Sequence, residues 1–383
     1  MVKHSNCFND LGIFGWGDIE PVILSAIIAD KSILLIGDHG SNKTEACEVI
    51  SKAILGSDIE FRHYEVPHLN FDDLIGYTNP KKLATGKLEF IETPISIWGA
   101  QAALFDEINK VNPFIQGKLH EIIRTKRIMG LKTDLQICFS AVNPPVKYQT
   151  SFMDLPLASR FCMVQVPSFT EFDDKIQNQI LNKGKTNGCL KLHRAVRRAK
   201  KHLDEIESTE IDPIIMKVMK DLKTTKINFS GRQARDLKQM FVAYKALSGV
   251  LGTALDTDTL TAITMSNIPE VNRVCRSEVE PSQVYGIIHT VLQGLKFNDP
   301  MILADGIEDL TKMDLKGLDL LDWMTSLKEA VISEDDVKAL EKAVIELDKK
   351  QIDKKTREKI LSSVGRIIVL KESGDKCVTE IMF

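Results

Sequence analysis

The sequence predicts an α/β protein in which a parallel sheet forms the first domain and helices form the rest. Short apolar runs recur through the first 168 residues, and SILLIG at 32–37 has the composition of a strand buried on both faces. Segments with helical spacing separate these runs, and such an alternation is typical of a parallel sheet. After Pro167 the strand-like runs end, and the chain reads as helices joined by polar turns.

The elements of the first domain follow in a regular order. Apolar residues recur at helical spacing over 19–29, the strand at 32–37 comes next, and a helix with one apolar stripe follows over 44–54. A strand, a glycine-containing turn and a helix in this order begin a βαβ unit. Further strands are expected at 102–105, 135–141 and 162–166, with helices at 111–124 and 155–159.

We therefore expect three parts: an α/β core over 1–168, a helical lid over 169–280 and a helical C-terminal extension over 281–383. In the lid we expect a charged helix over 193–208, a helix opened by Asp212 and Pro213, and a helix beginning at Ser230 or Gly231. The inner stripe of the last helix is Leu237, Met240, Phe241 and Tyr244. In the extension, amphipathic helices are expected over 318–327 and 337–347.

Composition excludes several classes of protein. The 383 residues hold 50 Lys and Arg against 53 Asp and Glu, so a globally basic nucleic-acid binder is excluded, although a local basic patch is not. The seven scattered cysteines form no CxxC pair, which argues against a disulfide framework or a zinc ribbon. The N-terminus lacks a signal-peptide pattern, and no apolar run approaches the length of a membrane span. We expect a soluble cytoplasmic protein that does not bind membranes.

The segment GDHGSNKT, residues 37–44, resembles the phosphate loop G-x-x-x-x-G-K-[ST], with Asn42 in place of the second glycine. Asparagine tolerates left-handed backbone angles better than most residues, and Gly40 adds freedom. Lys43 would reach the terminal phosphates and the Thr44 hydroxyl would bind Mg²⁺. The alternative is a strand–turn–helix without a ligand. The candidate nucleotide-binding residues are Gly37, Asp38, His39, Gly40, Ser41, Asn42, Lys43, Thr44 and Glu45.

Asp106 and Glu107 end an apolar strand, where two adjacent carboxylates are costly unless they are solvated or functional. In a nucleotide site Asp106 would help to hold Mg²⁺ and Glu107 would polarise the attacking water. The alternative is that Glu107 caps the following helix. Asn143 ends the next strand and would orient the water near the γ-phosphate, unless it only forms an Asn-Pro turn.

Two arginines complete the candidate catalytic set. Arg160 follows a short helix and would reach the γ-phosphate of a neighbouring subunit as an arginine finger, or it is a surface residue. Arg232 lies in the first turn of a helix, where a cation opposes the helix dipole, so an anionic partner is indicated. Arg235 is a nearby alternative.

In this order the motifs resemble those of an AAA+ ATPase, and more narrowly those of the MoxR family, which is related to magnesium chelatase ATPase subunits. The stretch 72–123 carries much of the resemblance, with Asp73-Leu74-Ile75-Gly76, a hairpin expected within 83–92 around Thr85-Gly86, and the acidic box Asp106–Lys110. SAVNPP, LPLASRF and FSGRQARDL resemble the first sensor, the finger segment and the second sensor. Ser159 and Gly231 replace the Asp and Pro that are usual in the family.

The resemblance covers about 10–265 and does not extend over 281–383. It implies ATP and Mg²⁺ as cofactors, with the nucleotide between core and lid. It also implies a homo-oligomeric ring of head-to-tail neighbours, with a hexamer as the expected size. It also implies a chaperone-like role in remodelling or maturing a protein partner, often a von Willebrand A domain protein. The helical tail either docks that partner or covers the lid.

Two hairpins, at 83–92 and at 126–137 with a turn near 129–132, are candidates for substrate contact. The alternative is that they only pack against the rest of the structure.

Two other functions of the protein remain open. One is a DNA-directed AAA+ motor, suggested by a basic run and opposed by the overall acidity. The other is a nucleotide-gated scaffold that does not hydrolyse ATP because of Asn42. The basic run consists of Arg194, Arg197, Arg198, Lys200 and Lys201.

Overall fold

The computed structural model divides the chain into two compact units, and the site lies in the first. This unit comprises residues 1–247 and 255–295, and the second comprises 248–254 and 296–383. The structure describes residues 7–110, 113–148, 151–182, 190–204, 206, 211–227, 229–253 and 255–293. The helices expected over 318–327 and 337–347 lie outside this description.

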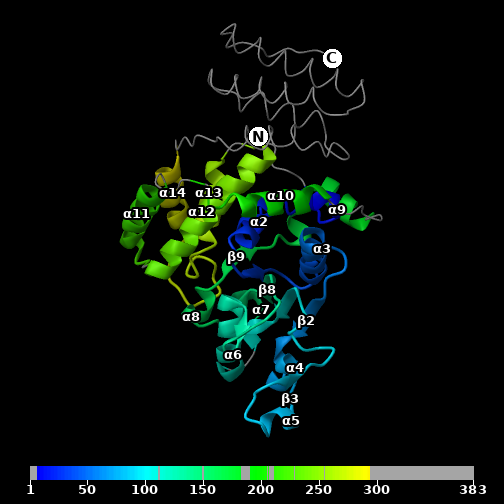
Figure 1. The fold of residues 1–383 in the computed structure, drawn as a ribbon. Coiled ribbons are helices and arrows are strands. Elements are labelled where there is room, and N and C mark those ends of the chain that lie inside the picture. Colours follow the sequence, from blue (N-terminus) through cyan, green and yellow to red (C-terminus); the bar gives the residue numbers. More distant parts are fainter. Residues whose placement is uncertain are drawn as a thin grey trace, which may run out of the picture. The chain divides into compact units, whose positions relative to one another are not determined.

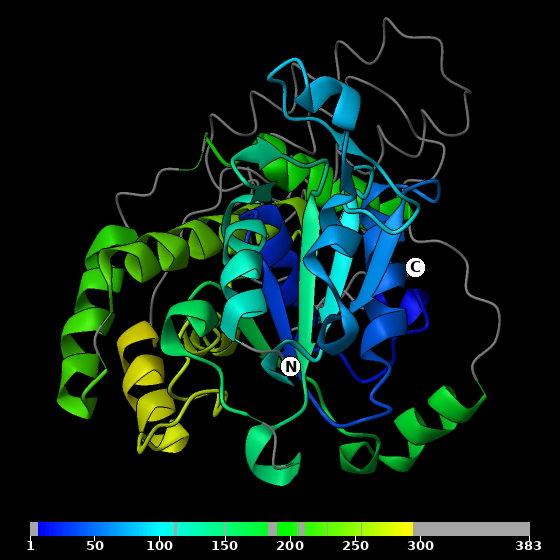
Figure 2. The same ribbon diagram turned by 90° about the horizontal axis from the view of Figure 1, so that it is seen from below.

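A five-stranded parallel sheet forms the centre of the unit (Figure 2). Its spatial order is β2-β5-β8-β1-β9, so the first core strand lies between two later ones. The strands are β1 Ile33–Ile36, β2 Phe61–Glu65, β5 Ala102–Asp106, β8 Ile137–Val142 and β9 Cys162–Gln165. The predicted parallel sheet is confirmed, and so are the four strands expected from apolar runs.

Strand β2 was not expected from the sequence. It reads FRHYE, and only Tyr64 of its five residues is buried. As an edge strand it pairs with β5 alone, so it does not need the continuous apolar run that marks a central strand. Its parallel pairing places Glu65 opposite Asp106 and His63 opposite Leu104.

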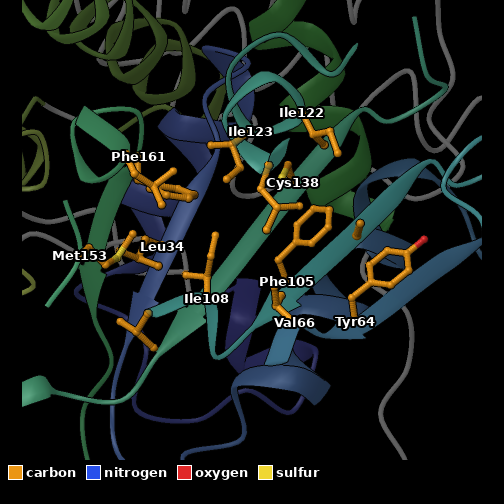
Figure 3. Close-up of a cluster of buried hydrophobic side chains, with 14 of the residues drawn as sticks. Leu34, Tyr64, Val66, Phe105, Ile108, Ile122, Ile123, Cys138, Met153 and Phe161 are labelled. Atoms are coloured by element: carbon orange, nitrogen blue, oxygen red, sulfur yellow. The ribbon is translucent and has the colours of Figure 1, made fainter. Parts of the chain in front are cut away.

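Helices pack against both faces of the sheet. The helices α2 Glu20–Ile28 and α3 Lys43–Leu55 contact β1, β8 and β9 on one face, as the expected helices at 19–29 and 44–54 require. On the other face, α6 Pro113–Thr125 and α8 Leu155–Ala158 cover a cluster of buried side chains (Figure 3). Strand residues in this cluster include Leu34, Phe105 and Cys138; Ile122 and Ile123 of α6 meet them.

Short elements connect these parts of the core. The helical turns α1, α4, α5 and α7 span Cys7–Asp10, Phe71–Ile75, Pro80–Leu83 and Pro145–Tyr148. The 3-10 turns η1, η2, η3 and η4 span Val66–His68, Ile108–Lys110, Phe169–Glu171 and Lys223–Thr225. Of the cysteines in the described residues, five are free and buried, which agrees with the absence of a disulfide framework: Cys7, Cys47, Cys138, Cys162 and Cys275.

The first hairpin differs from its prediction. Its antiparallel strands are β3 Tyr77–Thr78 and β4 Phe90–Ile91, and α5 lies between them. The expectation of a hairpin confined to 83–92 was therefore wrong in its first strand. Asn79 causes the difference, because its side chain accepts hydrogen bonds from the backbone of Lys81 and Lys82 and begins a helical turn.

The second hairpin is confirmed. Strands β6 Arg127–Ile128 and β7 Leu131–Lys132 pair antiparallel across Met129 and Gly130. Both turn residues have positive φ, 51° and 79°, which is the backbone of a two-residue hairpin turn of the primed type. The turn is shorter than expected, because residues 131–132 belong to the second strand.

The helical part begins after β9. Its helices are α9 Asp174–Leu181, α10 Leu190–Lys201, α11 Ile211–Leu222, α12 Gly231–Leu251, α13 Thr257–Met265 and α14 Pro281–Leu292. Helix α10 ends earlier than the expected residue 208. The expected inner stripe of α12 is buried. Helix α14 packs against α11 and α13, and its Val284 and Ile288 are buried. The division of the chain into core, lid and C-terminal extension stays a prediction.

Candidate functional site

The loop between β1 and α3 takes the conformation that its residues favour. Gly40 and Asn42 have positive φ, 76° and 55°, and Asn42 is in the left-handed region that asparagine tolerates. Gly37 has a different requirement: a Cβ added there would meet Val166 Cβ at 3.0 Å and the Val166 carbonyl oxygen at 3.2 Å. The glycine at 37 therefore lets the loop pass close to the end of β9.

Lys43 points back into this loop. Its ammonium donates to the carbonyl oxygens of Gly37 and Asp38, both at 2.8 Å, and to Ser41 Oγ at 3.2 Å. Burial lowers the pKa of Lys43, and the charges of Asp106 and Asp38 oppose that shift. The side chain is thus a buried cation at the centre of the loop, held by the loop's own oxygens.

The N-terminus of α3 carries no side-chain cap. Asn42 is the N-cap residue, and its side chain makes no capping hydrogen bond. The first N–H groups of a helix lack partners within the helix, and the helix dipole places partial positive charge there. Together with Lys43, these N–H groups form a site suited to a phosphate group.

The two carboxylates at the end of β5 are held separately. Asp106 Oδ1 accepts from the Glu107 backbone N–H at 2.8 Å, and Asp106 Oδ2 lies 3.7 Å from His63 Nε2 on β2. Burial alone would raise the pKa of Asp106, but these contacts and the charge of Lys43 lower it. In return, Asp106 raises the pKa of His63.

Glu107 occupies strained backbone. Its φ is 56°, a left-handed value that is uncommon for a residue other than glycine. Such strain concentrates at functional sites, because surrounding structure must hold it in place. The Glu107 carboxylate forms an ion pair with Lys110 of η2, and both side chains remain partly exposed.

Asn143 lies at the end of β8 and contacts the phosphate loop. The residue is buried, with 4% of its surface exposed, and its Nδ2 lies 3.1 Å from His39 Nε2. The ring of His39 in turn meets the ring of Tyr148 edge-on, with centroids 5.2 Å apart. These contacts join the loop to the end of β8 and to α7.

Asp38 forms a second connection between the loop and α7. Its carboxylate pairs with the Lys147 ammonium, and hydrogen bonds from Lys147, Tyr148 and Ser168 lower the pKa of Asp38 against the effect of its burial. The phosphate loop is therefore fixed on its outer side by α7 and by the start of η3.

A cavity of about 310 Å³ unites the loop with the ends of β5 and β8. Its lining consists of His39, Gly40, Ser41, Asn42, Lys43, Thr44, Glu45, Asp106, Glu107 and Asn143. The donor set suits a nucleotide with its metal, because Thr44 offers a hydroxyl and Asp106 a carboxylate, which are the hard oxygen ligands that Mg²⁺ prefers. The ammonium of Lys43 and the uncapped N–H groups of α3 suit phosphate oxygens.

Arg160 and Arg232 lie elsewhere. Neither lines this cavity; instead, Arg160 lies close enough to Arg232 and to Arg124 for their charges to act on it. Burial lowers the pKa of Arg160, the charges of Arg232 and Arg124 lower it further, and the charge of Asp154 opposes this shift. Among the described residues, the buried Nε of Arg160 has no hydrogen-bond partner. We call Arg124, Arg160 and Arg232 the arginine cluster.

Sequence reasoning missed several residues of the site. His63 lies on the unexpected edge strand, and its contact with Asp106 requires the register between β2 and β5. Lys147 and Tyr148 follow Asn143 closely, so their nearness to the site could have been inferred, but not their contacts with Asp38 and His39. Arg124 lies in the last turn of α6 and gave no signal beyond an ordinary helix end.

The comparisons with known proteins agree with this geometry. A family model, the AAA domain of the dynein-related subfamily, matches residues 32–161. The chain is 22% identical over 271 residues to structural protein ORF618 of Acidianus two-tailed virus. This alignment covers 67% of this chain and 41% of that protein. The chain thus spans about two fifths of the length of this curated relative.

Solved structures with similar folds were also found. A protein from Cytophaga hutchinsonii ATCC 33406, provisionally described as an ATPase, aligns with a TM-score of 0.54 at 16% identity. The alignment covers 76% of this chain and 93% of that one, which shows a shared fold. Separately, none of the described helices has both the length and the apolar character needed to cross a membrane.

Proposed function

We propose that the chain is an AAA+ protein that acts as a Mg²⁺-dependent ATPase and remodels a protein partner; the AAA domain model matches its residues 32–161. One observation carries the proposal. A single cavity brings together the phosphate loop, the carboxylates at the end of β5 and the amide of Asn143. These groups come from segments that are distant in the sequence, since His39 and Asn143 are 104 positions apart.

The phosphate loop and the start of α3 would bind the nucleotide. The uncapped N–H groups of α3 and the Lys43 ammonium would hold the β- and γ-phosphates. To do so, Lys43 exchanges its bonds to loop carbonyls for bonds to phosphate oxygens. Thr44 and Asp106 would hold Mg²⁺, which supplies positive charge that neutralises the phosphate oxygens.

Hydrolysis requires water positioned at the γ-phosphorus. Glu107 would accept a proton from that water. The water oxygen then forms a bond to the γ-phosphorus, while the bond between that phosphorus and the oxygen that stays on ADP breaks. The strained backbone of Glu107 aims this carboxylate at the cavity, provided that it leaves its ion pair with Lys110. Asn143 would orient the water or the γ-phosphate through its amide.

The arginine cluster supports a site shared between subunits. Like charges brought together are unfavourable, and the charge of Asp154 offsets their effect on Arg160 only in part. The buried Nε of Arg160 also has no hydrogen-bond partner in the described part of the chain. Since these arginines do not line the cavity of their own chain, we propose that Arg160 and Arg232 contact the triphosphate bound by a neighbour. Such a head-to-tail contact closes into a ring when its rotation allows, and a hexamer is the proposed size.

The two hairpins offer contact surfaces for a partner. In the first, four large apolar side chains are exposed, and this segment extends away from the sheet in Figure 1. They are Tyr77, Leu83, Leu88 and Ile91, and the exposed Ile95 follows the hairpin closely. The tip of the second exposes Met129 and Leu131. Apolar surface of this kind suits a protein segment better than a nucleic-acid backbone.

We propose a MoxR-like chaperone role on the basis of the motif order, and a von Willebrand A domain protein as the kind of partner. Removing either hairpin tip should leave ATP binding intact and abolish the contact with the partner. A tenfold fall in ATP affinity in these variants would show that the hairpins are structural. Filter binding with DNA at low and moderate salt tests the nucleic-acid alternative.

A second candidate function is a scaffold that binds nucleotide without hydrolysing it. Two observations favour it: the Glu107 carboxylate already forms an ion pair with Lys110, and the viral relative is described as a structural protein. In such a scaffold, bound nucleotide would control assembly through the arginine cluster, and Glu107 would not serve as a base.

Phosphate release from ATP decides between these functions. The wild-type chain should release phosphate in the presence of Mg²⁺, and Lys43→Ala gives the blank. Glu107→Gln should retain ATP binding and lose turnover about 10³-fold, because it removes the proton acceptor while keeping the shape of the side chain. If the wild type binds ATP but releases no more phosphate than the blank, the chain is a scaffold.

A further inference from the structure

We propose that His39 is a positioning residue that fixes the amide of Asn143 and thereby lets the site distinguish ATP from ADP. This inference rests on the proposed function, because it assigns a task to a residue within the same cavity. Asn143 would touch the γ-phosphate or the attacking water. His39 would act through Asn143 and not on the reacting atoms themselves.

The contact between the two side chains defines their orientation. An amide nitrogen only donates hydrogen bonds, so Nδ2 of Asn143 donates to Nε2 of His39 across 3.1 Å. The neutral ring must then carry its proton on Nδ1. One N–H of the amide is committed to His39, and the second N–H and the carbonyl oxygen remain to face the cavity that Asn143 lines.

The ring of His39 is itself held. Tyr148 meets it at an interplanar angle of 89°, and α7, which carries Tyr148, begins two residues after Asn143. The same helical turn binds the loop again through Lys147 and Asp38. His39 therefore lies between two supports, the end of β8 and α7, and it also lines the cavity.

This arrangement explains how the amide is prevented from rotating. The last torsion of an asparagine side chain has a broad energy profile, so packing alone specifies the direction of its amide weakly. A hydrogen bond from the phosphate loop removes that freedom. It also links the position of Asn143 to the phosphate loop.

The test compares His39→Ala with His39→Gln, in which the amide oxygen can occupy the place of Nε2 and accept the hydrogen bond from Asn143. His68→Ala is the matched control, since His68 is exposed on η1 between β2 and α4. We expect His39→Ala to lower kcat about tenfold with little change in KM, and His39→Gln to restore most of it. In the Asn143→Ala background, His39→Ala should have no further effect.

A binding measurement gives a second readout that does not need turnover. In the Glu107→Gln background, the ratio of the Kd for ADP to the Kd for ATP should fall about tenfold with His39→Ala and stay constant with His68→Ala. If His39→Ala leaves both kcat and this ratio unchanged, or lowers kcat equally without Asn143, the inference is overturned.

The outcomes separate this inference from the proposed function. A wild-type chain that binds ATP without hydrolysing it refutes the ATPase, and the ratio of affinities still decides the role of His39. A wild-type chain that binds no ATP refutes both. Hydrolysis by the wild type together with an unaffected His39→Ala variant refutes only the positioning role.

Discussion

The phosphate loop and the arginine cluster both concentrate positive charge, but they satisfy it in opposite ways. Lys43 is buried and donates to three oxygens of its own loop. Arg160 lies among other arginines, and its buried Nε has no partner in the described part of the chain. The loop satisfies its cation with its own oxygens, whereas the charge of Asp154 only partly offsets the repulsion between Arg160 and its neighbouring arginines.

This difference shows which part of the site one chain can supply. A buried donor without an acceptor costs free energy, and neighbouring like charges add to that cost. Under the proposed function, the nucleotide of a neighbouring subunit would supply the missing acceptor. The loop can therefore bind phosphate in an isolated chain, whereas the cluster would become useful only where another subunit's nucleotide reaches it.

The sharpest test replaces the finger arginine. Arg160→Ala should lower kcat about 10³-fold while ATP affinity of the isolated chain stays the same, because the side chain would stabilise only a neighbour's transition state. Mixing Arg160→Ala with Lys43→Ala should restore part of the activity, since the second variant still carries an intact arginine. Mixtures as inactive as the separate variants would contradict a shared site.

Replacing the loop cation should have the complementary effect. Lys43→Ala should weaken ATP binding about 100-fold, because it removes charged hydrogen bonds to phosphate. Calorimetric titration of the isolated chain measures this change, and Lys147→Ala serves as a comparison that removes a nearby cation outside the cavity lining. An equal loss in both variants would mean that general charge, and not the position of Lys43, attracts the nucleotide.

A third cation, Lys31, tests how much a buried charge depends on its partner. Its ammonium lies 2.6 Å from Asn267 Oδ1 and 3.1 Å from Asp236 Oδ2, which joins the core to α12 and the end of α13. Asp236→Ala should lower the free energy of unfolding by about 2 kcal/mol, because it leaves a buried cation without its counter-ion. Urea unfolding measures the change, and Asp236→Asn should lose less.

The pH dependence of this variant follows from the pKa of Lys31. Burial lowers that pKa in the folded state, and the charge of Asp236 opposes the shift, so Asp236→Ala should lower it further. Between the folded and unfolded pKa values the unfolded chain binds more protons, and stability rises with pH. The deficit of Asp236→Ala should therefore shrink as pH rises through that window. A deficit independent of pH would indicate lost packing alone.

The smallest effect is expected on the outer side of the loop. The Lys147 ammonium lowers the pKa of Asp38, so Lys147→Ala should move that pKa back toward its ordinary value. A lowered folded pKa contributes stability above the unfolded pKa, and that contribution is lost as pH falls through the folded pKa. The variant should thus lose less stability on acidification. An NMR titration of the Asp38 carboxyl that shows no shift would contradict this.

The sequence by itself determined the local parts of the molecule. The apolar runs predicted the central strands, and GDHGSNKT predicted the loop, because Gly37, Gly40 and Asn42 set the backbone over a few residues. Asp106 and Glu107 were identified because two carboxylates at the end of an apolar strand are unusual. Each of these inferences depends on residue type and short-range spacing.

Only the tertiary structure decided which of these groups meet. The contacts of His39 with Asn143 and of His63 with Asp106, and the nearness of Arg160 to Arg232, join segments that are distant in sequence. Strand β2 escaped prediction because an edge position asks little of its side chains. Backbone preferences act between neighbours along the chain, whereas side-chain contacts depend on strand order and helix packing, which the whole core sets together.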